Sequence, residues 1–335
     1  MKLNPEPQLT AGKNKAAANT SHDGVTLAAL FKALGDSLRL QIVRLLKSDS
    51  LSVSELCEVF DLRQSALSHH LKILVEAGLL VRRREGTAIF YRRGLAISQN
   101  SHLLEAVYSS IDAEPLGTGL KVAMARVQQQ REQNSLAFFR TNHARFREQQ
   151  ELIASWEDYS QAALHLLDHS NAPTNLPLIE IGPGDGRLLP LLAQRTTHVV
   201  ALDNAPEMLE SARSYASQVA NIAYVLGDTS TLTHSETRYS AAIMNMVLHH
   251  TPKPERVLAE AGCALAPGGV LIISELVAHD QAWAREHCGD LWLGFEPDQI
   301  TAWAQQAGLE SRAELFITQR NGFQIQVRSL QKMQD

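Results

Sequence analysis

Residues 176–187 read LPLIEIGPGDGR, a short apolar run directly before a glycine-rich turn. The apolar run predicts a buried strand, and Gly182, Gly184 and Gly186 predict a tight turn into a following helix. Such a turn lets the backbone approach a ligand at the carboxyl end of a strand. The dinucleotide fingerprint requires G-x-G-x-x-G, but Arg187 stands where its third glycine would be. The long arginine side chain therefore argues against a dinucleotide pyrophosphate site.

From Leu176 onward, short apolar runs alternate with longer amphipathic segments. This alternation predicts a parallel sheet with right-handed crossover helices. The predicted fold of this half is α/β, a doubly wound, Rossmann-like seven-stranded sheet that ends in a hairpin. The expected strands are Leu178–Ile181, Val199–Asp203, Ala223–Leu226, Ala241–Met246, Val270–Glu275, Ala313–Thr318 and Phe323–Arg328.

Acidic residues follow two of these strands, at the edge where doubly wound sheets bind ligands. Asp203 lies about twenty residues beyond the glycine-rich turn, so its carboxylate can accept hydrogen bonds from two ribose hydroxyls. Asp228, which precedes Thr229, could hold an adenine amino group. These two carboxylates are therefore candidate ligand-binding residues at this edge.

The series from about Trp156 to Arg328 resembles the class I S-adenosylmethionine-dependent methyltransferases, with their motifs in order and at the usual spacing. Residues 289–309, GDLWLGFEPDQITAWAQQAGL, also resemble a segment of methyltransferase domains fused to ArsR-type regulators. The resemblance implies that S-adenosylmethionine or S-adenosylhomocysteine is the ligand. The residues expected in its pocket are Glu180, Gly182, Gly184, Asp203, Asn204, Asp228, Thr229, Asn245 and Met246.

The first half of the chain has a different pattern. Amphipathic helices are expected at 25–34, 37–47, 52–60 and 64–77, and Gly78 ends the last of them. Strands at 79–84 and 87–92 follow, joined by a turn at Glu85 and Gly86. Helices closed by a β-hairpin predict a winged helix-turn-helix.

The window 62–93 is strongly basic within an acidic chain. It holds seven Lys or Arg residues against two acids, a charge of 7 − 2 = +5, whereas the net charge of the chain is −5. Such an excess is typical of a phosphate-binding face. In helix 64–77, leucines form the buried stripe and short polar side chains point outward. Because a recognition helix enters the major groove by its N-terminal end, the candidate DNA contacts are Gln64, Ser65, Ser68, His69 and Lys72.

Three segments closely resemble the winged-helix repressors of the ArsR/SmtB type. They are LFKALGDSLRLQIVRLL at 30–46, SVSELCEVFDLRQSALSHHLKIL at 52–74 and EAGLLVRRREGTAIFYR at 76–92. The resemblance implies a homodimer on an inverted-repeat operator in double-stranded DNA. It matches the outward residues of helix 64–77 to the recognition helix, and Arg84, Gly86 and Tyr91 to the wing.

Many relatives of this type sense metals or arsenite, but both family sites are incomplete here. One site uses two cysteines on the helix before the recognition helix, where only Cys57 is present. The other uses His and acidic ligands on the last helix, and the spacing of His102, Glu105 and Asp112 places no clear ligand set on one face. No metal is therefore expected, and Cys57 is interpreted as a packed core residue.

A chain of 335 residues is long enough for two domains. We expect a disordered arm at 1–22, a DNA-binding and dimerisation domain at 23–112, a hinge and connecting helix at 113–155, and a methyltransferase-like domain at 156–335. No run approaches the roughly 18 apolar residues of a membrane span, and the N-terminus has no signal-peptide pattern. The three cysteines show no disulfide spacing. A cytoplasmic location away from membranes is expected.

Two functions remain open. In the first, the chain is a transcriptional regulator whose C-terminal domain senses S-adenosylmethionine or S-adenosylhomocysteine. We expect this regulator to be a repressor. In the second, the C-terminal domain is an active methyltransferase of a small molecule and the DNA-binding domain is autoregulatory. The sensor is favoured because the sequence identifies a cofactor site but no site for a methyl acceptor. No catalytic residue is assigned; His249 and His250 are candidate bases, with packing beneath the cofactor as the alternative.

Overall fold

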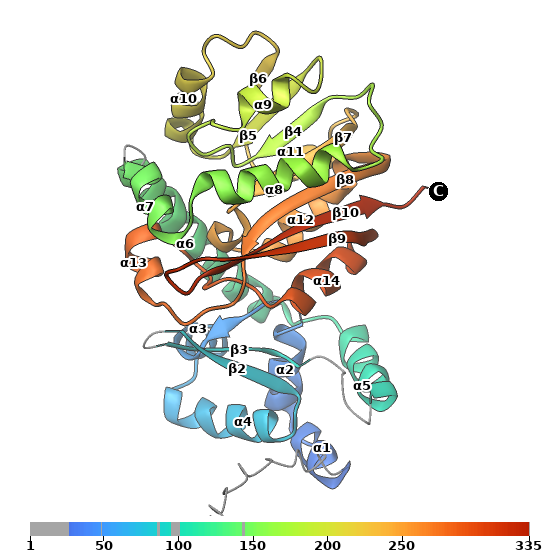
Figure 1. Cartoon of the computed structure of the whole chain (residues 1–335). Helices are drawn as coiled ribbons and strands as arrows, with labels where there is room; N and C mark the ends of the chain where they lie inside the picture. The colour runs from blue at the N-terminus through green and yellow to red at the C-terminus, as the bar shows by residue number, and fades with distance from the viewer. Residues whose placement is uncertain (1–26, 48, 86–87, 95–100, 143–144, 335) are drawn as a thin grey trace, which may run out of the picture.

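The computed structural model describes residues 27–47, 49–85, 88–94, 101–142 and 145–334. They form two packed parts, one built on a three-stranded sheet and the other on a seven-stranded sheet (Figure 1). The helix α6 (Thr118–Asn142) contacts both parts, through α3 at one end and α10 at the other. Among the described residues, no helix is long and apolar enough to span a membrane.

The N-terminal part packs short helices against a β-hairpin. Reciprocal hydrogen bonds between Ser52 and Glu55 form a capping box that starts α3, and Asp61 in the left-handed region ends it. Leu67, Leu71 and Leu74 of α4 are buried, as their spacing predicts. This arrangement confirms the predicted winged helix. Its elements are α1 (Leu27–Leu34), α2 (Ser37–Leu45), β1 (Leu51–Ser52), α3 (Val53–Phe60), α4 (Gln64–Glu76), β2 (Leu80–Glu85) and β3 (Ala88–Arg93), with strand order β1-β3-β2.

Helices connect this part to the larger sheet. α5 (Ser101–Ala113) and the first turns of α6 complete the winged-helix core, to which Leu104, Ile111, Met124 and Val127 contribute buried side chains. α6 has 25 residues and is therefore about 37 Å long. α7 (Phe146–Ile153) and α8 (Trp156–Asp168) then lead to the first strand of the larger sheet.

The C-terminal part is a mixed sheet with strand order β6-β5-β4-β7-β8-β10-β9. The first five strands in that order are parallel, and β10 is antiparallel to both of its neighbours. This confirms the predicted doubly wound, seven-stranded sheet. Its strands are β4 (Leu178–Ile181), β5 (Val199–Asp203), β6 (Ile222–Leu226), β7 (Tyr239–Asn245), β8 (Leu265–Leu276), β9 (Leu309–Thr318) and β10 (Gln324–Lys332). The helices among them are α9 (Leu189–Ala193), α10 (Pro206–Tyr215), α11 (Ser230–Thr233), η2 (Leu248–His250), α12 (Pro254–Ala264), α13 (Trp283–Cys288) and α14 (Pro297–Gln306).

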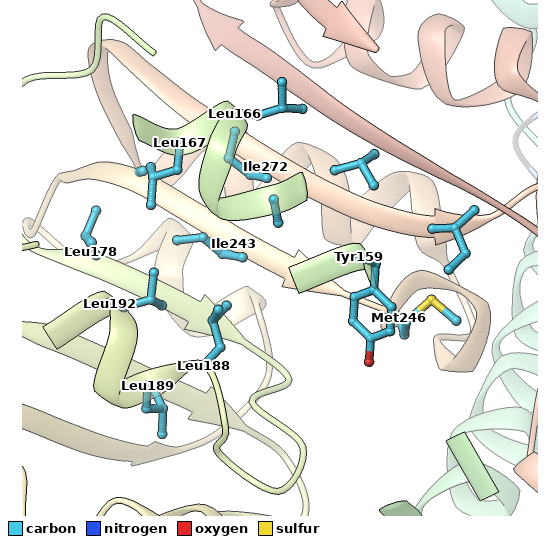
Figure 2. Close-up of a cluster of buried hydrophobic side chains, with 14 of the residues drawn as sticks. Tyr159, Leu166, Leu167, Leu178, Leu188, Leu189, Leu192, Ile243, Met246 and Ile272 are labelled. Carbon is cyan, nitrogen blue, oxygen red and sulfur yellow. The ribbon is translucent and has the colours of Figure 1, made fainter. Parts of the chain in front are cut away.

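Both faces of the larger sheet are buried, because alternate residues of a strand point to opposite faces. Leu178 and Ile243 pack with α8 and α9 on one face, where Figure 2 shows them beside Leu166 and Leu192. Ile179 packs with α12 and α14 on the other face.

The main difference from the expected strands is at β8, which begins at Leu265 and not at Val270. In the added segment, Gly268 takes a φ of 74°, and the register of β8 with β7 shifts between Tyr239 and Ala241. Glycine accommodates this irregularity within the strand because it lacks a Cβ.

Candidate functional site

A cavity of about 400 Å³ opens at the carboxyl ends of β4 to β7. The structure brings together in its wall all of the residues predicted for an adenosyl ligand: Glu180, Gly182, Gly184, Asp203, Asn204, Asp228, Thr229, Asn245 and Met246. Glu180, Asp203 and Asn245 lie in β4, β5 and β7, and the other residues follow the carboxyl ends of β4 to β7. In the sequence, only the order of the motifs groups them. Their convergence is the main feature of the site.

The glycine-rich turn forms one side of this cavity. Gly182, Gly184 and Gly186 all have positive φ. A Cβ at Gly186 would lie 2.7 Å from the Cα of Ala212, so the turn has no space for a side chain there. Arg187, the residue that departs from the dinucleotide fingerprint, stacks on Trp156 with its guanidinium 4.8 Å from the ring centre. The turn thus exposes its backbone to the cavity. The side chain of Arg187 packs against Trp156.

Several polar groups in the wall lack partners within the protein. Glu180 is buried and its Oε2 makes no hydrogen bond; burial, and then the charge of Asp185, raise its pKa well above the usual range. Neither amide atom of the Asn245 side chain has a partner. Met246, next to it, has a φ of 56°, which is unusual for a residue with a side chain. Unpaired buried donors and acceptors at a strained backbone position fit a polar ligand.

Asp203 ends β5 and accepts a hydrogen bond of 2.8 Å from the backbone N–H of Ala205. Burial raises the pKa of Asp203 to about 6, although backbone hydrogen bonds act in the opposite direction. Thr229 donates to Glu260 at 2.6 Å, which holds the hydroxyl against α12. Asp228 accepts from both the N–H and the hydroxyl of Ser230. These three residues therefore sit in fixed positions along the cavity.

Sequence reasoning missed the opposite wall. Side chains of α6, among them Gln128, Glu132, Ser135 and Phe139, line the cavity together with Trp156 and Tyr159 of α8. Ser135 donates a hydrogen bond of 3.0 Å to the carbonyl oxygen of His250. No motif marks these positions, because the outward face of α6 reads as an ordinary polar helix surface.

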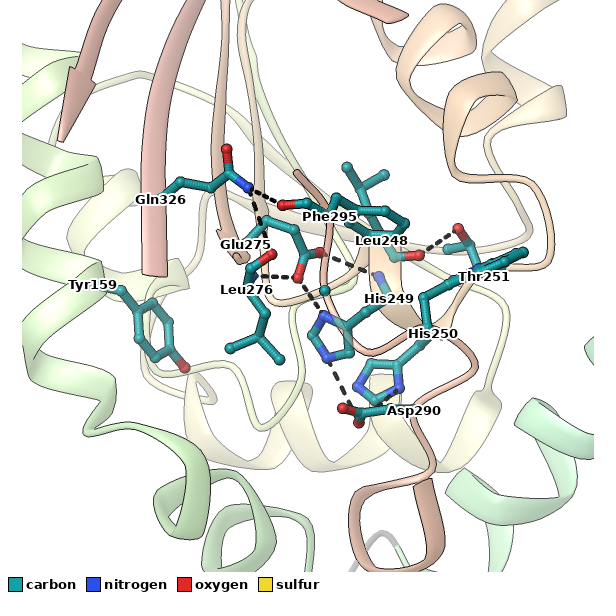
Figure 3. A network of polar contacts seen from close by, with 12 residues as sticks. Tyr159, Leu248, His249, His250, Thr251, Glu275, Leu276, Asp290, Phe295 and Gln326 are labelled. Atoms are coloured by element: carbon teal, nitrogen blue, oxygen red, sulfur yellow. Dashed lines mark hydrogen bonds and ion pairs between the residues drawn. The ribbon is translucent and has the colours of Figure 1, made fainter. Parts of the chain in front are cut away.

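The two candidate bases differ in position (Figure 3). His250 lines the cavity, and its Nδ1 lies 3.3 Å from the carbonyl oxygen of Gly289. His249 is fully buried (0% exposed), and its Nδ1 lies 2.5 Å from Oε1 of Glu275. His249 is not among the residues that line the cavity, whereas His250 is. The role of either histidine as a base, and the alternative of packing beneath the cofactor, stay predictions.

The predicted DNA contacts on α4 share one exposed face. Gln64, Ser65, Ser68, His69 and Lys72 are all exposed. The hydroxyl of Ser68 donates to the carbonyl oxygen of Gln64 at 2.7 Å, so it must rotate to reach a base edge. The face is available to a groove of DNA.

The wing agrees less well with the sequence-based expectation. Arg84 is exposed, whereas Gly86 lies outside the described residues. Tyr91 is only 8% exposed and packs in the winged-helix core, so it does not present its ring to DNA. The reason is that both faces of β3 are covered. Tyr91 faces the helices of its own domain, and the preceding Phe90 faces Trp292 across the domain boundary.

Two arginines of the basic window also have structural partners. Arg93 makes a bidentate ion pair with Asp112 and donates to the carbonyl oxygen of Val43. Arg83 donates to the carbonyl oxygen of Gly294 in the larger domain at 3.0 Å. The charge available to DNA is therefore smaller than the count of +5 suggests.

At the positions of the two family metal sites, the side chains have other contacts. Cys57 is half-buried against the winged-helix core, and Asp112 is engaged by Arg93. His102 lies on the surface, 3.9 Å from Glu105. Among the described residues, three side chains of metal-binding types in the other domain lie close enough together to share an ion. They are His249, His250 and Asp290.

Comparisons with known proteins agree with this division. The family model "Bacterial regulatory protein, arsR family" matches residues 36–81, and the model "Methyltransferase domain" matches residues 179–273. The biofilm growth-associated repressor of Agrobacterium fabrum is 41% identical over 83 residues, which are 25% of this chain and 69% of the repressor. The ubiquinone biosynthesis O-methyltransferase of Coxiella burnetii is 25% identical over 146 residues, 39% of this chain. This chain spans only 62% of that enzyme's length.

Among solved structures, the N-methyltransferase NodS of Bradyrhizobium japonicum, in complex with S-adenosyl-L-homocysteine, is 16% identical with a TM-score of 0.44. The similarity covers 56% of this chain and 97% of NodS. The [4+2]-cyclase SpnF is 14% identical with a TM-score of 0.46, over 54% of this chain and 84% of SpnF. Together with the winged helix and the seven-stranded sheet, the sequence matches establish that the chain belongs to the arsR family of bacterial regulatory proteins and carries a methyltransferase domain after its helix-turn-helix.

Proposed function

We propose that the chain is a DNA-binding transcriptional regulator whose methyltransferase domain binds S-adenosylmethionine or S-adenosylhomocysteine as an effector. The cavity residues support the ligand class. In this proposal Asp203 accepts ribose hydroxyls and Asp228 holds the adenine amino group. The unpaired polar atoms of Glu180 and Asn245, which line the same cavity, bind the amino-acid end. The glycine turn brings backbone close to the bound molecule.

The observation that carries the proposal is that α6 belongs to both domains. Met124 and Val127 are buried in the winged-helix core, whereas Ser135 and Phe139, further along the same helix, line the cavity. Arg140, near the C-terminal end, lies 3.5 Å from Glu207 of α10. A helix that contacts the ligand cavity and the DNA-binding core at once can pass a displacement from one to the other.

Arg131 fixes the middle of this helix to the winged helix. Its Nε and Nη2 lie 2.7 and 2.8 Å from the two carboxylate oxygens of Glu55 in α3, and Nη2 also donates to the carbonyl oxygen of Ser50. The guanidinium lies over the ring of Trp292, 4.5 Å from its centre. Arg131 therefore joins α6, the winged helix and the methyltransferase domain at one point.

The wing is tied to the methyltransferase domain as well. Phe90 of β3 packs against Trp292 with ring centres 6.2 Å apart, and the guanidinium of Arg285 lies 4.8 Å from the Phe90 ring centre. A shift of the residues around the cavity would thus change the position of the wing. We infer that ligand binding alters the spacing of the two winged helices in a homodimer that binds an inverted-repeat operator. Leu27 and Phe31, exposed apolar side chains on α1, support a dimer surface.

Fluorescence anisotropy of a labelled duplex, selected from a random pool with the full-length protein, tests the proposal. Saturating S-adenosylhomocysteine or S-adenosylmethionine should change the DNA dissociation constant by at least about fivefold. The change should disappear at the same ligand concentration in Asp203→Ala and remain in Asp298→Ala, an acid of α14 outside the cavity wall. An identical DNA dissociation constant with and without each ligand would contradict the effector role.

A second candidate, methylation of a small molecule, is favoured by the wall that α6 and α8 add to the cavity. Gln128 and Glu132 of α6 and Tyr159 of α8 line the cavity, as does His250 of η2, in addition to the residues assigned to the adenosyl ligand. A methyl donor already carries its leaving group, so an acceptor held in line can be enough for transfer. Release of S-adenosylhomocysteine from S-adenosylmethionine with a panel of hydroxyl, amine and thiol acceptors would establish turnover.

A further inference from the structure

A buried polar cluster lies beneath the cavity and is separate from the residues assigned to the adenosyl ligand. Asp290 is 3% exposed, and neither of its carboxylate oxygens has a hydrogen-bond partner. The Nε2 of His249 is also buried without a partner. Leaving such groups unpaired is costly in a protein interior, so a native cluster of this kind requires an occupant or a proton arrangement that explains it.

The unpaired atoms of His249 and Asp290 point toward one another, and the ring of His250 lies beside them (Figure 3). Nδ1 of His250 also lies 3.3 Å from the carbonyl oxygen of Gly289, a contact that it would give up to bind an ion. Oδ1 of Asp290 lies 3.9 Å from Nε2 of His249 and 3.9 Å from Nδ1 of His250. One potential ligand atom from each residue falls within 4.8 Å of the others. These gaps are too long for hydrogen bonds. Two donor atoms of a tetrahedral zinc ion with bonds of about 2.0–2.1 Å lie about 3.3 Å apart. The two gaps of 3.9 Å are longer than this, so a bound ion would draw the three side chains closer together.

The far side of His249 is held in the way that metal-binding histidines are held. Its Nδ1 lies 2.5 Å from Oε1 of Glu275, and the other oxygen of Glu275 accepts the backbone N–H of His249 at 3.2 Å. Leu276 also donates its N–H to Oε1 at 2.6 Å. Since the carboxylate accepts the Nδ1 hydrogen, the Nε2 lone pair is left to face Asp290. A carboxylate behind the histidine orients the ring and increases its basicity as a ligand.

We propose that His249, His250 and Asp290 form a binding site for a divalent transition-metal ion, with Glu275 as the outer partner of His249. Two imidazoles and one carboxylate favour Zn²⁺ or a similar first-row ion over Mg²⁺ or Ca²⁺, which prefer oxygen donors. The competing arrangement is a protonated His249 between Glu275 and Asp290. It would leave both Asp290 oxygens without a hydrogen bond at the observed distances.

Such an ion would fasten the loop after α13 to the strand ends. Asp290 is close in sequence to Trp292 and Gly294, which contact Arg131 and Arg83, and His250 lines the ligand cavity. The ion would therefore lie between the cavity and the domain boundary. The three residues are distinct from the sequence positions that correspond to the family's sites, Cys57 on one helix and His102 with Asp112 on another. The inference does not depend on whether the adenosyl ligand is an effector.

The test uses tag-free, full-length protein purified without chelator, so that no polyhistidine tag contributes metal. Elemental analysis should find one transition-metal ion per chain. After removal of this ion, Co²⁺ should restore it and give the visible absorption of a cobalt site with nitrogen ligands, which Zn²⁺ then abolishes. Glu275→Gln should weaken Zn²⁺ binding about 10–100-fold, and Asp290→Asn and His249→Gln should abolish it at equimolar metal.

The matched controls are His287→Gln, an exposed histidine three residues from Asp290, and Asp298→Asn; both should bind metal as the wild type does. The wild-type measurement stands even if a variant fails to fold. Wild-type protein that contains no metal and gives no cobalt spectrum would overturn the proposal. So would stoichiometric metal that persists unchanged in folded Asp290→Asn and His249→Gln, because the ion would then lie elsewhere.

Discussion

Replacement of Arg131 by methionine should weaken both the fold and the communication between the domains. Methionine keeps much of the side-chain volume but removes two charged hydrogen bonds to Glu55, one to Ser50 and the contact with the Trp292 ring. Breaking a fully buried ion pair costs about 3–5 kcal/mol, because the remaining charge has no partner. Glu55 keeps some contact with solvent. We therefore expect a loss of about 2–4 kcal/mol in the free energy of unfolding.

A double-mutant cycle separates the pair from its surroundings. Wild type, Arg131→Met, Glu55→Gln and the double variant are compared by urea denaturation without ligand. The pair should show a coupling energy of about 1–3 kcal/mol. In the double variant no charge is left unpaired, so it should be more stable than Arg131→Met. In the same four proteins, the ligand-induced change in DNA affinity should fall from at least about fivefold to near unity wherever the pair is broken.

Two results would refute this reasoning. Additive stability effects, within about 0.5 kcal/mol, would mean that Arg131 and Glu55 do not interact in solution. A ligand response that stays at its wild-type size in a folded Arg131→Met protein would mean that the contact of α6 with α3 does not transmit ligand binding.

Three further predictions concern other parts of the chain. Asp203→Asn should stabilise the ligand-free protein at pH 8 by up to about 3 kcal/mol. The pKa of Asp203 in the folded protein, about 6, lies above its unfolded value, so the ionised carboxylate destabilises the fold at pH 8. The stabilisation of Asp203→Asn over the wild type should become small near pH 4, where Asp203 is protonated in the folded protein, and thermal denaturation at a series of pH values can measure it. Replacing Ser68, His69 and Arg84 together by alanine should weaken operator binding, because each base contact contributes about 1–3 kcal/mol. Calorimetry should show that the ligand affinity is unchanged, and a triple variant that binds DNA as tightly as the wild type would contradict the assignment. Cys57→Ser should bind DNA as the wild type does, and arsenite should release neither protein from DNA. Release of the wild type by arsenite that is lost in Cys57→Ser would contradict this prediction.

Much of the fold was predictable because its signals are local. The apolar stripe of Leu67, Leu71 and Leu74 defines the recognition helix, and the run into Gly182 defines the first strand of the larger sheet. Residues at strand ends, such as Asp203, could be grouped because parallel strands bring their carboxyl ends to one edge.

The remaining features depend on contacts between distant segments. Tyr91 reads as a wing residue, and only the tertiary packing shows that both faces of β3 are covered. Arg83 adds to the charge count of the wing but bonds to Gly294, which is 211 residues away. The cluster of His249 and Asp290 joins positions about forty residues apart, and no motif spacing marks them.

The most direct test of effector binding is calorimetric titration of wild-type protein with S-adenosylhomocysteine, and separately with S-adenosylmethionine, in the presence and absence of saturating selected duplex. Coupling between two sites is reciprocal, so a ligand that changes DNA affinity must have its own dissociation constant changed by DNA to the same extent. The proposed function predicts a difference of at least about fivefold for one of the two ligands. Equal dissociation constants for both ligands, with and without DNA, would contradict it.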